Sequence, residues 1–377
     1  MKKHKICIIG DGLTGLTAAT ALNNLGLDVE LYHNNKSLNI NRDKRITAIS
    51  NSNLEFFKKI VSVEEIKTIW PCKQINLYYE KKTGIINFLN FKKKSKFFLH
   101  IFQNYYFKNF LFKNLKRNKV KMSSVKIDKV DFMDTSIKIK KKSIYYDLII
   151  LCVGNKSSLY KNFIGSRIIK KDYKQTAITG FVNHKLKLND AAQYFLKEGP
   201  LAFLPFKKNT FSYVWSLENK YYKKNKKNLK NLLKKKLENL LNSKKFSLSK
   251  VQSYPLHLSV RKKYYNNNTL ILGEGLHSIH PIAGQGFNLV MRDIIELYKI
   301  INKNISLGLE IKDSLILKDL NNQRRPENTI FSIGVDLTNT FFKKNKYFGP
   351  LKDLVVENVS KIKIINKISQ RIADKGL

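Results

Sequence analysis

Three glycines near the N-terminus have the spacing of a phosphate-binding turn. Residues 6–9 form a short apolar run typical of a buried strand, residues 10–15 read Gly-Asp-Gly-Leu-Thr-Gly, and the next ten residues have helical apolar spacing. In such a unit Gly10 permits the tight turn, Gly12 lets the backbone approach a pyrophosphate, and Gly15 lets the helix pack on the strand. The helix start offers free N–H groups and a positive dipole end to the phosphates. The spacing alone is a weak signal, but in this context it predicts a dinucleotide site.

Two side chains compete for the place beside the adenosine ribose. Residues 26–32 read as the second parallel strand, and Glu30 lies 20 residues after Gly10, close to the usual distance of the ribose-binding acid. Counted to the end of the strand, however, the position that faces the ribose is His33, and Glu30 falls in mid-strand. An imidazole can bond a hydroxyl, though less strongly than a charged acceptor. We therefore expect His33 beside the ribose, with Glu30 as the alternative.

A second glycine-rich segment lies far along the chain. Residues 269–272 have the composition of a strand, residues 273–289 form a dense turn of Gly, His and Pro, and a helix follows through Asp293. Backbone amides at such a helix start suit an anionic, planar ring system. The alternative is a loop that only connects a strand to a helix.

These segments together resemble the FAD-dependent aromatic hydroxylases, most closely their ubiquinone-biosynthesis branch. The second strand–turn–helix of that family reads GD..H..HP..GQG.N, and Gly273, His277, His280-Pro281, Gly284-Gln285-Gly286 and Asn288 match it. Residues 41–50, with Arg45, look like the family's D.R..A.S stretch. Residues 199–206 with Val214-Trp215 are similar to the branch's GP.A.LP strand and the strand after it, and residues 323–341 fit its tail. The resemblance spans nearly the whole chain.

The resemblance implies a flavoprotein monooxygenase. FAD would be reduced by NADPH or NADH, O2 would be the co-substrate, and one oxygen atom would be placed on the ring of a polyprenylated phenol. The difficult chemistry belongs to the cofactor, so we assign no catalytic side chain. Amides of residues 284–288 would stabilise the negative charge of the reduced flavin. We predict no metal site, since His277 and His280 lie in a turn.

The predicted cofactor-binding residues lie in the two glycine segments and in the stretches that match the family. Gln103 is included because it precedes an apolar helical stretch, although a surface role is equally compatible with its position. The full set is Gly10, Gly12, Leu13, Thr14, Gly15, His33, Arg45, Gln103, Gly154, Gly273, Glu274, Pro281, Gly284, Gln285, Gly286, Phe287 and Asn288.

Some positions depart from the family pattern. The family has a strand ending in Asp-Gly, then Ser and Arg, which serves both FAD and the nicotinamide cofactor; here Val153 replaces the aspartate and Tyr160 the arginine. Glu274 stands where an aspartate normally bonds the ribityl chain, and His33 replaces the ribose-binding acid. One explanation is tolerated drift. The other is an altered electron donor or a lost activity, which gives an alternative function: a catalytically impaired FAD-binding scaffold of the quinone pathway.

The order of the motifs predicts an α/β fold whose domains interleave. We expect a glutathione-reductase-like FAD-binding Rossmann domain, a β-rich substrate domain and a helical C-terminal region. The FAD-binding domain would comprise residues 1–75, 101–165 and 265–305, and the substrate domain residues 76–100 and 166–264. Residues 306–377 would form the C-terminal region.

The net charge of +43 has two explanations. It arises from 71 Lys and Arg against 28 Asp and Glu, and it could mark a nucleic acid or an anionic membrane as a partner. However, Lys, Asn, Ile, 23 Phe and 18 Tyr are over-used together, which is typical of drift toward AT-rich codons, and the lysines are scattered. We favour drift and predict no nucleic-acid partner. Docking on a membrane or to ubiquinone-pathway enzymes stays open.

Residues 221–241 form a lysine-rich segment that bears on the two explanations of the net charge. Leucines fall on one face of the expected helix and lysines elsewhere, so the helix either packs on the substrate sheet, which we favour, or lies on a membrane surface. The leucines are Leu229, Leu232, Leu233, Leu237, Leu240 and Leu241.

The remaining features concern the compartment. No apolar run approaches the roughly 18 residues of a membrane-spanning helix, and the basic N-terminus is followed by too short an apolar stretch for an export signal. Cys7, Cys72 and Cys152 form neither a disulfide framework nor a zinc site. These features indicate a reduced, cytoplasmic compartment, with attachment to the inner face of the cytoplasmic membrane as an open addition.

Overall fold

The computed structural model describes most of the chain. The described residues are 4–33, 45–61, 69–92, 97–155, 157–160, 163, 168–313, 315–343, 349–359 and 363–375. Residues 41–44, the start of the stretch that resembles the family's D.R..A.S, lie outside them, whereas Arg45 lies inside.

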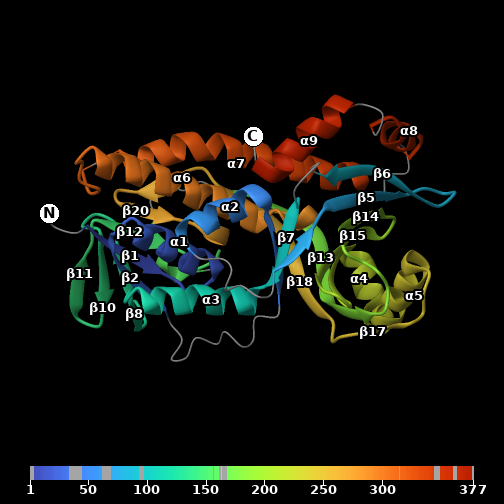
Figure 1. Ribbon diagram of the computed structural model, residues 1–377, viewed down its shortest axis with the longest axis horizontal. Helices are drawn as coiled ribbons and strands as arrows, with labels where there is room; N and C mark the ends of the chain where they lie inside the picture. The colour runs from blue at the N-terminus through green and yellow to red at the C-terminus, as the bar shows by residue number, and fades with distance from the viewer. Residues whose placement is uncertain are drawn as a thin grey trace.

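A largely parallel sheet forms one half of the molecule (Figure 1). Its apolar strands β1 and β12 are buried on both faces, as expected where helices or further strands cover both faces. In spatial order the strands are β19 (Tyr265–Asn266), β20 (Thr269–Ile271), β12 (Leu148–Leu151), β1 (Lys5–Ile9), β2 (Asp28–His33) and β8 (Lys121–Ser124), of which only β19 runs antiparallel to its neighbour.

Helices and a small meander enclose this sheet. Helix α1 (Leu13–Asn24) contacts both α3 (Asn104–Arg117) and α6 (Gly286–Ser306). The meander adds Val130 and Ile137 to the same hydrophobic core. Its strands are β9 (Lys129–Asp131), β10 (Ser136–Ile139) and β11 (Lys142–Tyr145). The strand–turn–helix predicted at the N-terminus is confirmed, although the helix begins at Leu13, three residues earlier than expected.

A mainly antiparallel sheet forms the other half (Figure 1). Its spatial order is β21 (His277–Ser278), β18 (Gln252–Arg261), β13 (Ile168–His184), β16 (Thr210–Glu218), β15 (Gly199–Lys207), β14 (Ala191–Leu196), β5 (Gln74–Glu80) and β6 (Ile85–Lys92), with β17 (Phe246–Leu248) also on β13. A third sheet consists of β3 (Ile46–Ser50), β7 (Leu99–Gln103) and β4 (Trp70–Cys72), and its strands precede and follow β5 and β6 in the sequence.

The lysine-rich helix predicted over residues 221–241 packs on the antiparallel sheet. It is divided into α4 (Asn219–Asn225), a short 3-10 turn (Lys226–Asn228) and α5 (Leu229–Leu241). Leu233 and Leu237 are fully buried in a core with Trp215 and Phe211 of the sheet. The face proposed for membrane contact is therefore covered by protein, and the packing explanation is confirmed.

The C-terminal region is helical. Helix α7 (Ile316–Phe342) begins beside α6, and its far end contacts the antiparallel sheet, where Asn339 Nδ2 donates to Gln175 Oε1 at 3.2 Å. The ring of Phe342 stacks on Phe195 with centroids 3.7 Å apart. The remaining helices are α2 (Asn51–Ile60), α8 (Gly349–Val359) and α9 (Lys363–Lys375).

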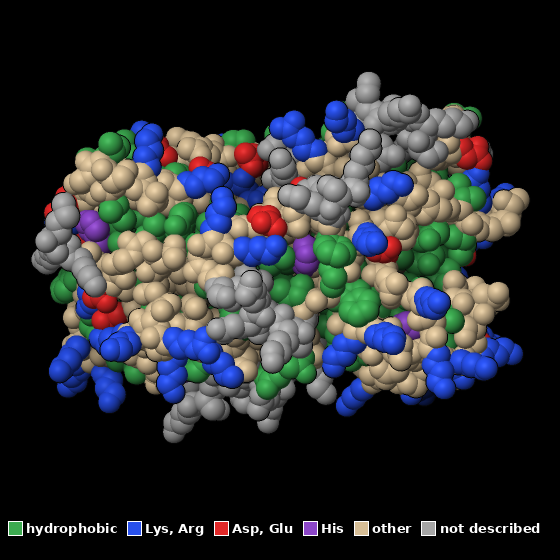
Figure 2. Space-filling model, in the orientation of Figure 1, with side chains coloured by type: hydrophobic (Ala, Val, Ile, Leu, Met, Phe, Trp, Pro, Cys, Tyr) green, Lys and Arg blue, Asp and Glu red, His purple; other side chains and the backbone are tan. Residues whose placement is uncertain are grey.

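The positive charge is spread over the surface. Figure 2 shows Lys and Arg side chains distributed across the visible face among polar and apolar atoms. Among the described residues no helix is long and apolar enough to cross a membrane.

Candidate cofactor site

A cavity of about 430 Å³ lies where the carboxyl ends of the parallel strands meet the antiparallel sheet. This edge of a parallel sheet is where α/β folds bind nucleotides. Leu204 of β15 reaches the cavity from the antiparallel sheet. Of the predicted residues, those that line it are Gly12, Leu13, Thr14, Arg45, Gly154, Glu274, Pro281, Gly284, Gly286 and Phe287.

The first glycine turn has the backbone geometry that its sequence requires. Gly10 has φ of +118°, and a Cβ there would lie 2.4 Å from the carbonyl oxygen of Cys152. A Cβ on Gly15 would lie 1.8 Å from the carbonyl oxygen of Gly10. A Cβ on Gly12, by contrast, would meet nothing within 4 Å. Gly10 and Gly15 therefore build the turn, while Gly12 leaves open space beside it.

Two helix N-termini face this cavity. Gly12 is the N-cap of α1 and Gln285 the N-cap of α6, and neither helix has a side-chain cap or an acidic residue in its first turn. Gly12 and Gly286 both line the cavity. The unclaimed N–H groups and the dipole ends suit negatively charged groups.

The second glycine segment is shaped by close packing. Gly273 has φ of +77°, and a Cβ there would lie 2.8 Å from the hydroxyl of Thr14 on the first turn. The two glycine turns thus pack directly on each other. Glu274 follows within a short 3-10 helix, Gly273–Gly275, and lines the cavity.

Asn288 and Gln285 are buried and do not line the cavity. Asn288 Oδ1 accepts from the backbone N–H of Ser50 at 2.8 Å and from Asn53 Nδ2 at 2.9 Å, and its own Nδ2 donates to the carbonyl of Ala48. This side chain ties the start of α6 to β3 and α2. The side-chain atoms of Gln285 have no partner among the described residues. A direct cofactor contact by either residue stays a prediction.

Glu30 is buried in a hydrogen-bond network of its own and does not line the cavity. Glu30 lies in mid-strand, as predicted, and accepts from Tyr32 at 2.8 Å, Tyr146 at 2.6 Å and Lys121 at 2.7 Å. Burial opposes its ionisation, but these donors outweigh burial and lower the pKa of Glu30 to about 2. His33 ends β2, is buried and does not line the cavity, so its ribose contact stays a prediction.

Tyr160, one of the substituted family positions, packs against Gly275 in the second turn. The hydroxyl of Tyr160 donates to the carbonyl of Gly154 at 2.8 Å, and burial raises its pKa. The guanidinium of Arg261, from β18, lies 4.7 Å from the Tyr160 ring centre, and its Nε donates to the carbonyl of Gly275 at 2.6 Å. A cation from another strand therefore lies beside the position where the family has an arginine.

Sequence reasoning missed several lining residues. Gln103 is the N-cap of α3 and does not line the cavity, whereas its neighbour Asn104 does and accepts from the Thr47 hydroxyl at 2.6 Å. Most of the other missed residues lie close to the motifs in the sequence, and that proximity was the signal that could have identified them. The other missed residues are Ile46, Thr47, Ala48, Cys152, Leu204, Leu272, His277, Ser278, Ile279 and Val290.

The residues present fit a flavin dinucleotide. The cavity joins a first turn with open space at Gly12 to a second helix start at Gly286, so one elongated anionic ligand can meet both. Among the described residues no group of His, Cys, Asp and Glu could hold a metal ion.

Comparison with known proteins finds matches to this chain both in sequence and in fold. Residues 141–308 match the family model described as FAD binding domain. The fold matches the crystal structure of p-nitrophenol 4-monooxygenase PnpA from Pseudomonas putida DLL-E4 with a TM-score of 0.79 at 13% identity, covering 98% of this chain and 97% of that one. It also matches PqsL, a probable FAD-dependent monooxygenase from Pseudomonas aeruginosa, with a TM-score of 0.75 at 14% identity, over 93% and 100% of the two chains. The chain therefore has the fold of these proteins and carries an FAD-binding domain.

Several curated relatives are similar to parts of this chain. The ubiquinone biosynthesis monooxygenase COQ6 of Dictyostelium discoideum is 31% identical over 44% of this chain and 37% of its own length. The ubiquinone hydroxylase UbiL of Rhodospirillum rubrum is 29% identical over 48% and 43%, and the 3-demethoxyubiquinol 3-hydroxylase of Escherichia coli is 29% identical over 41% and 40%. The chain thus spans about two fifths of the length of these relatives. At this modest identity they indicate the ubiquinone-biosynthesis branch of FAD-dependent hydroxylases and confirm the resemblance carried by the glycine segments.

Proposed function

We propose that this protein is an FAD-dependent monooxygenase that hydroxylates the aromatic ring of a polyprenylated phenol in ubiquinone biosynthesis, using NAD(P)H and O2. One observation carries the proposal: a single cavity joins two uncapped helix N-termini to a wall supplied by the antiparallel sheet. Such a cavity would suit a dinucleotide, and the part of its wall that comes from the antiparallel sheet would face a second ligand.

The two turns would bind different parts of the cofactor. The amides around Gly12 would bind the pyrophosphate, and those at the start of α6, from Gly284 to Asn288, would lie beside the ring system. When bound, the flavin supplies the redox chemistry and the activation of O2. We take residues 1–75, 101–165 and 265–305 as the FAD-binding domain, residues 76–100 and 166–264 as the substrate domain, and residues 306–377 as the helical C-terminal region.

The remaining work falls to the chain itself, which must orient a phenolic ring and exclude water. Apolar side chains of the cavity wall suit both tasks, because they offer an aromatic ring contact without competing hydrogen bonds. They come from both halves of the fold, with Leu204 on β15 and Phe287 and Val290 on α6.

The test separates cofactor binding from turnover. Purified protein should show a flavin absorption spectrum, and anaerobic NADPH or NADH should bleach it. Complementation of strains blocked at single ring-hydroxylation steps should then restore one step. Protein that binds FAD and is bleached, yet restores no step, would contradict the proposed substrate class.

A catalytically impaired FAD-binding scaffold is the second candidate. Val153 and Tyr160 replace the two charged residues of the family pattern, and the Tyr160 hydroxyl is committed to the carbonyl of Gly154. A stable FAD complex that neither nicotinamide reduces would favour this candidate. Recovery of bleaching in Val153→Asp would then assign the loss to that substitution.

The location of the substrate suggests a place at the membrane surface. A polyprenylated phenol partitions into lipid, and a basic surface favours an anionic leaflet. Peripheral contact with the inner face of the cytoplasmic membrane predicts flotation with phosphatidylglycerol vesicles at low salt but not with phosphatidylcholine vesicles. Equal flotation with both, or with neither, would contradict it.

A further inference from the structure

His277 combines a place in the cavity wall with a firmly held ring. It belongs to β21, which lies in the sequence between the 3-10 helix Gly273–Gly275 and the start of α6, and it lines the cavity. Its Nε2 lies 2.7 Å from Oδ2 of Asp293 on α6, and both side chains are 1% exposed. The other ring nitrogen, Nδ1, is buried and has no hydrogen-bond partner among the described residues. One ring nitrogen of this imidazole is thus committed to Asp293, and the other is buried without a hydrogen-bond partner among the described residues.

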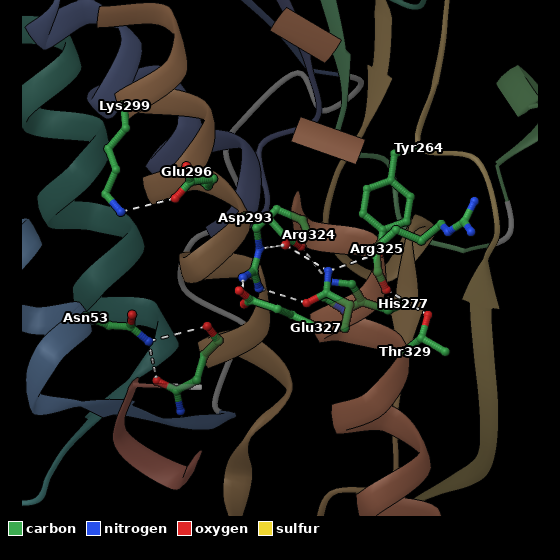
Figure 3. A network of polar contacts seen from close by, with 12 residues as sticks. Asn53, Tyr264, His277, Asp293, Glu296, Lys299, Arg324, Arg325, Glu327 and Thr329 are labelled. Atoms are coloured by element: carbon green, nitrogen blue, oxygen red, sulfur yellow. Dashed lines mark hydrogen bonds and ion pairs between the residues drawn. The ribbon is translucent and has the colours of Figure 1, made fainter. Parts of the chain in front are cut away.

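Helix α7 determines the state of Asp293. Arg324 Nε donates to Asp293 Oδ1 at 2.8 Å (Figure 3). Asn328 Nδ2 donates to the same oxygen at 2.8 Å and also to the hydroxyl of Tyr264. Burial opposes ionisation of Asp293, but His277 and Arg324 outweigh it and hold the pKa of Asp293 below its ordinary value. Asp293 is therefore a carboxylate, and the proton shared with His277 belongs to the imidazole Nε2.

The unpartnered nitrogen must then be an acceptor. A second proton at Nδ1 would place an N–H with no described partner in the interior, and a buried unpaired donor is costly. With the proton at Nε2, neutral His277 presents a lone pair at Nδ1. A ligand that satisfies this atom must bring a hydroxyl or an N–H.

We propose that His277 is a cofactor-positioning residue, whose Nδ1 accepts a hydrogen bond from a hydroxyl or N–H of bound flavin because Asp293 and Arg324 fix its tautomer. Through Arg324 the helix α7, whose far end contacts the antiparallel sheet, takes part in the cofactor site. This inference rests on FAD binding and not on the hydroxylation reaction.

Asp293→Asn gives a sharp perturbation because its orientation is determined. Arg324 and Asn328 both donate to the Oδ1 position, so the amide oxygen of the new side chain should face them and its NH2 group should face His277. His277 would then accept at Nε2 and carry its proton at Nδ1. The acceptor becomes a donor, while the size of the side chain is nearly unchanged.

The tautomer can be measured in the wild-type protein, with variants needed only for assignment and comparison. Long-range ¹H–¹⁵N spectra of histidine-labelled wild-type protein distinguish Nε2–H from Nδ1–H, and loss of one ring signal in His277→Gln assigns the residue. We expect Nε2–H in the wild type with and without FAD, and Nδ1–H in Asp293→Asn. A wild-type proton at Nδ1, or a doubly protonated ring with FAD bound, would overturn the proposal.

FAD titration followed by flavin fluorescence supplies the second readout. Asp293→Asn and His277→Phe should each weaken FAD binding about five- to tenfold, the value of one hydrogen bond between neutral groups. His277→Gln should recover part of that loss, since its amide oxygen can accept. The matched control is His184→Gln, at a buried histidine on β13 that does not line the cavity, and it should bind FAD as the wild type does.

The outcomes distinguish this inference from the proposed function. If wild-type protein binds no FAD, the cofactor assignment itself fails. If it binds FAD and folded Asp293→Asn and His277→Phe bind equally well, the positioning role fails while the proposed function stands. Loss of FAD binding in His184→Gln to the same degree would reduce the effect at His277 to a general loss of fold and overturn the proposal.

Discussion

Gly12 offers the clearest test of the first turn, because its replacement by alanine should leave the rest of the protein undisturbed. Its backbone is extended, with φ of −69° and ψ of 173°, which alanine adopts readily, and a Cβ would meet nothing within 4 Å. We therefore expect Gly12→Ala to keep the free energy of unfolding of the apoprotein within about 0.5 kcal/mol of wild type.

The same methyl group would occupy the space in which a pyrophosphate must approach the start of α1. Loss of a single hydrogen bond between a backbone N–H and a charged phosphate costs about 1.5–3 kcal/mol, so FAD binding should weaken about ten- to hundredfold. Fluorescence titration of the apoprotein measures the affinity, and urea unfolding of the same protein measures the stability.

Gly15→Ala is the matched variant with the opposite expectation. Its Cβ would lie 1.8 Å from the carbonyl oxygen of Gly10, far inside van der Waals contact, so α1 would have to move away from β1. Alanine gains about 1 kcal/mol in helix propensity, but overpacking costs about 1–3 kcal/mol or more, and the net change should be destabilising. FAD binding would fall as a consequence of the displaced helix.

The pair of variants can refute the reasoning in two ways. Wild-type FAD affinity in Gly12→Ala would show that no phosphate approaches this turn. Wild-type stability in Gly15→Ala would show that the helix and strand are not in the contact described. The geometry agrees with only one combination of results. Gly12→Ala must be stable but bind FAD weakly, and Gly15→Ala must be destabilised.

Three further predictions concern the core of each half. Because the pKa of Glu30 is lowered to about 2, its stabilising effect is complete above about pH 4.3 and is lost as the pH falls through 2; Glu30→Gln should be less stable at pH 7, and urea unfolding should show the difference closing between pH 4 and 2 rather than staying constant. Leu233→Ala should cost about 2–5 kcal/mol in chemical denaturation and exposed Lys234→Ala almost nothing, whereas equal small effects would place α5 away from the sheet. Burial raises the pKa of the Cys7 and Cys72 thiols, neither of which lines the cavity, so a thiol reagent should modify neither within minutes in the native protein and both in denaturant; rapid native labelling of either would contradict their burial.

The local features were predictable because their causes are local. A glycine spacing specifies a turn through steric limits that operate over a few residues, which is why the roles of Gly10 and Gly15 could be derived before their surroundings were known. The packing of the leucine face of α5 follows in the same way from apolar periodicity.

Other site features arise from contacts between distant segments. Asn288 matches a motif next to the flavin turn, yet its side chain is used on Ser50, Asn53 and Ala48, more than 230 residues earlier in the chain. Asn104 lines the cavity in place of its neighbour Gln103 because the site depends on where β7 ends and α3 begins. A one-residue shift at such a junction points a different side chain into the site.

The sequence by itself determined the two glycine turns, their order along the chain and the family that they resemble. The tertiary structure decided which side chains meet: it packs Gly273 on Thr14, places Arg261 beside Tyr160, and joins His277 to Asp293 and Arg324. The physical reason is range. Backbone turns are set by sterics within a few residues, whereas a buried hydrogen-bond network exists only when strands and helices from separate parts of the chain converge.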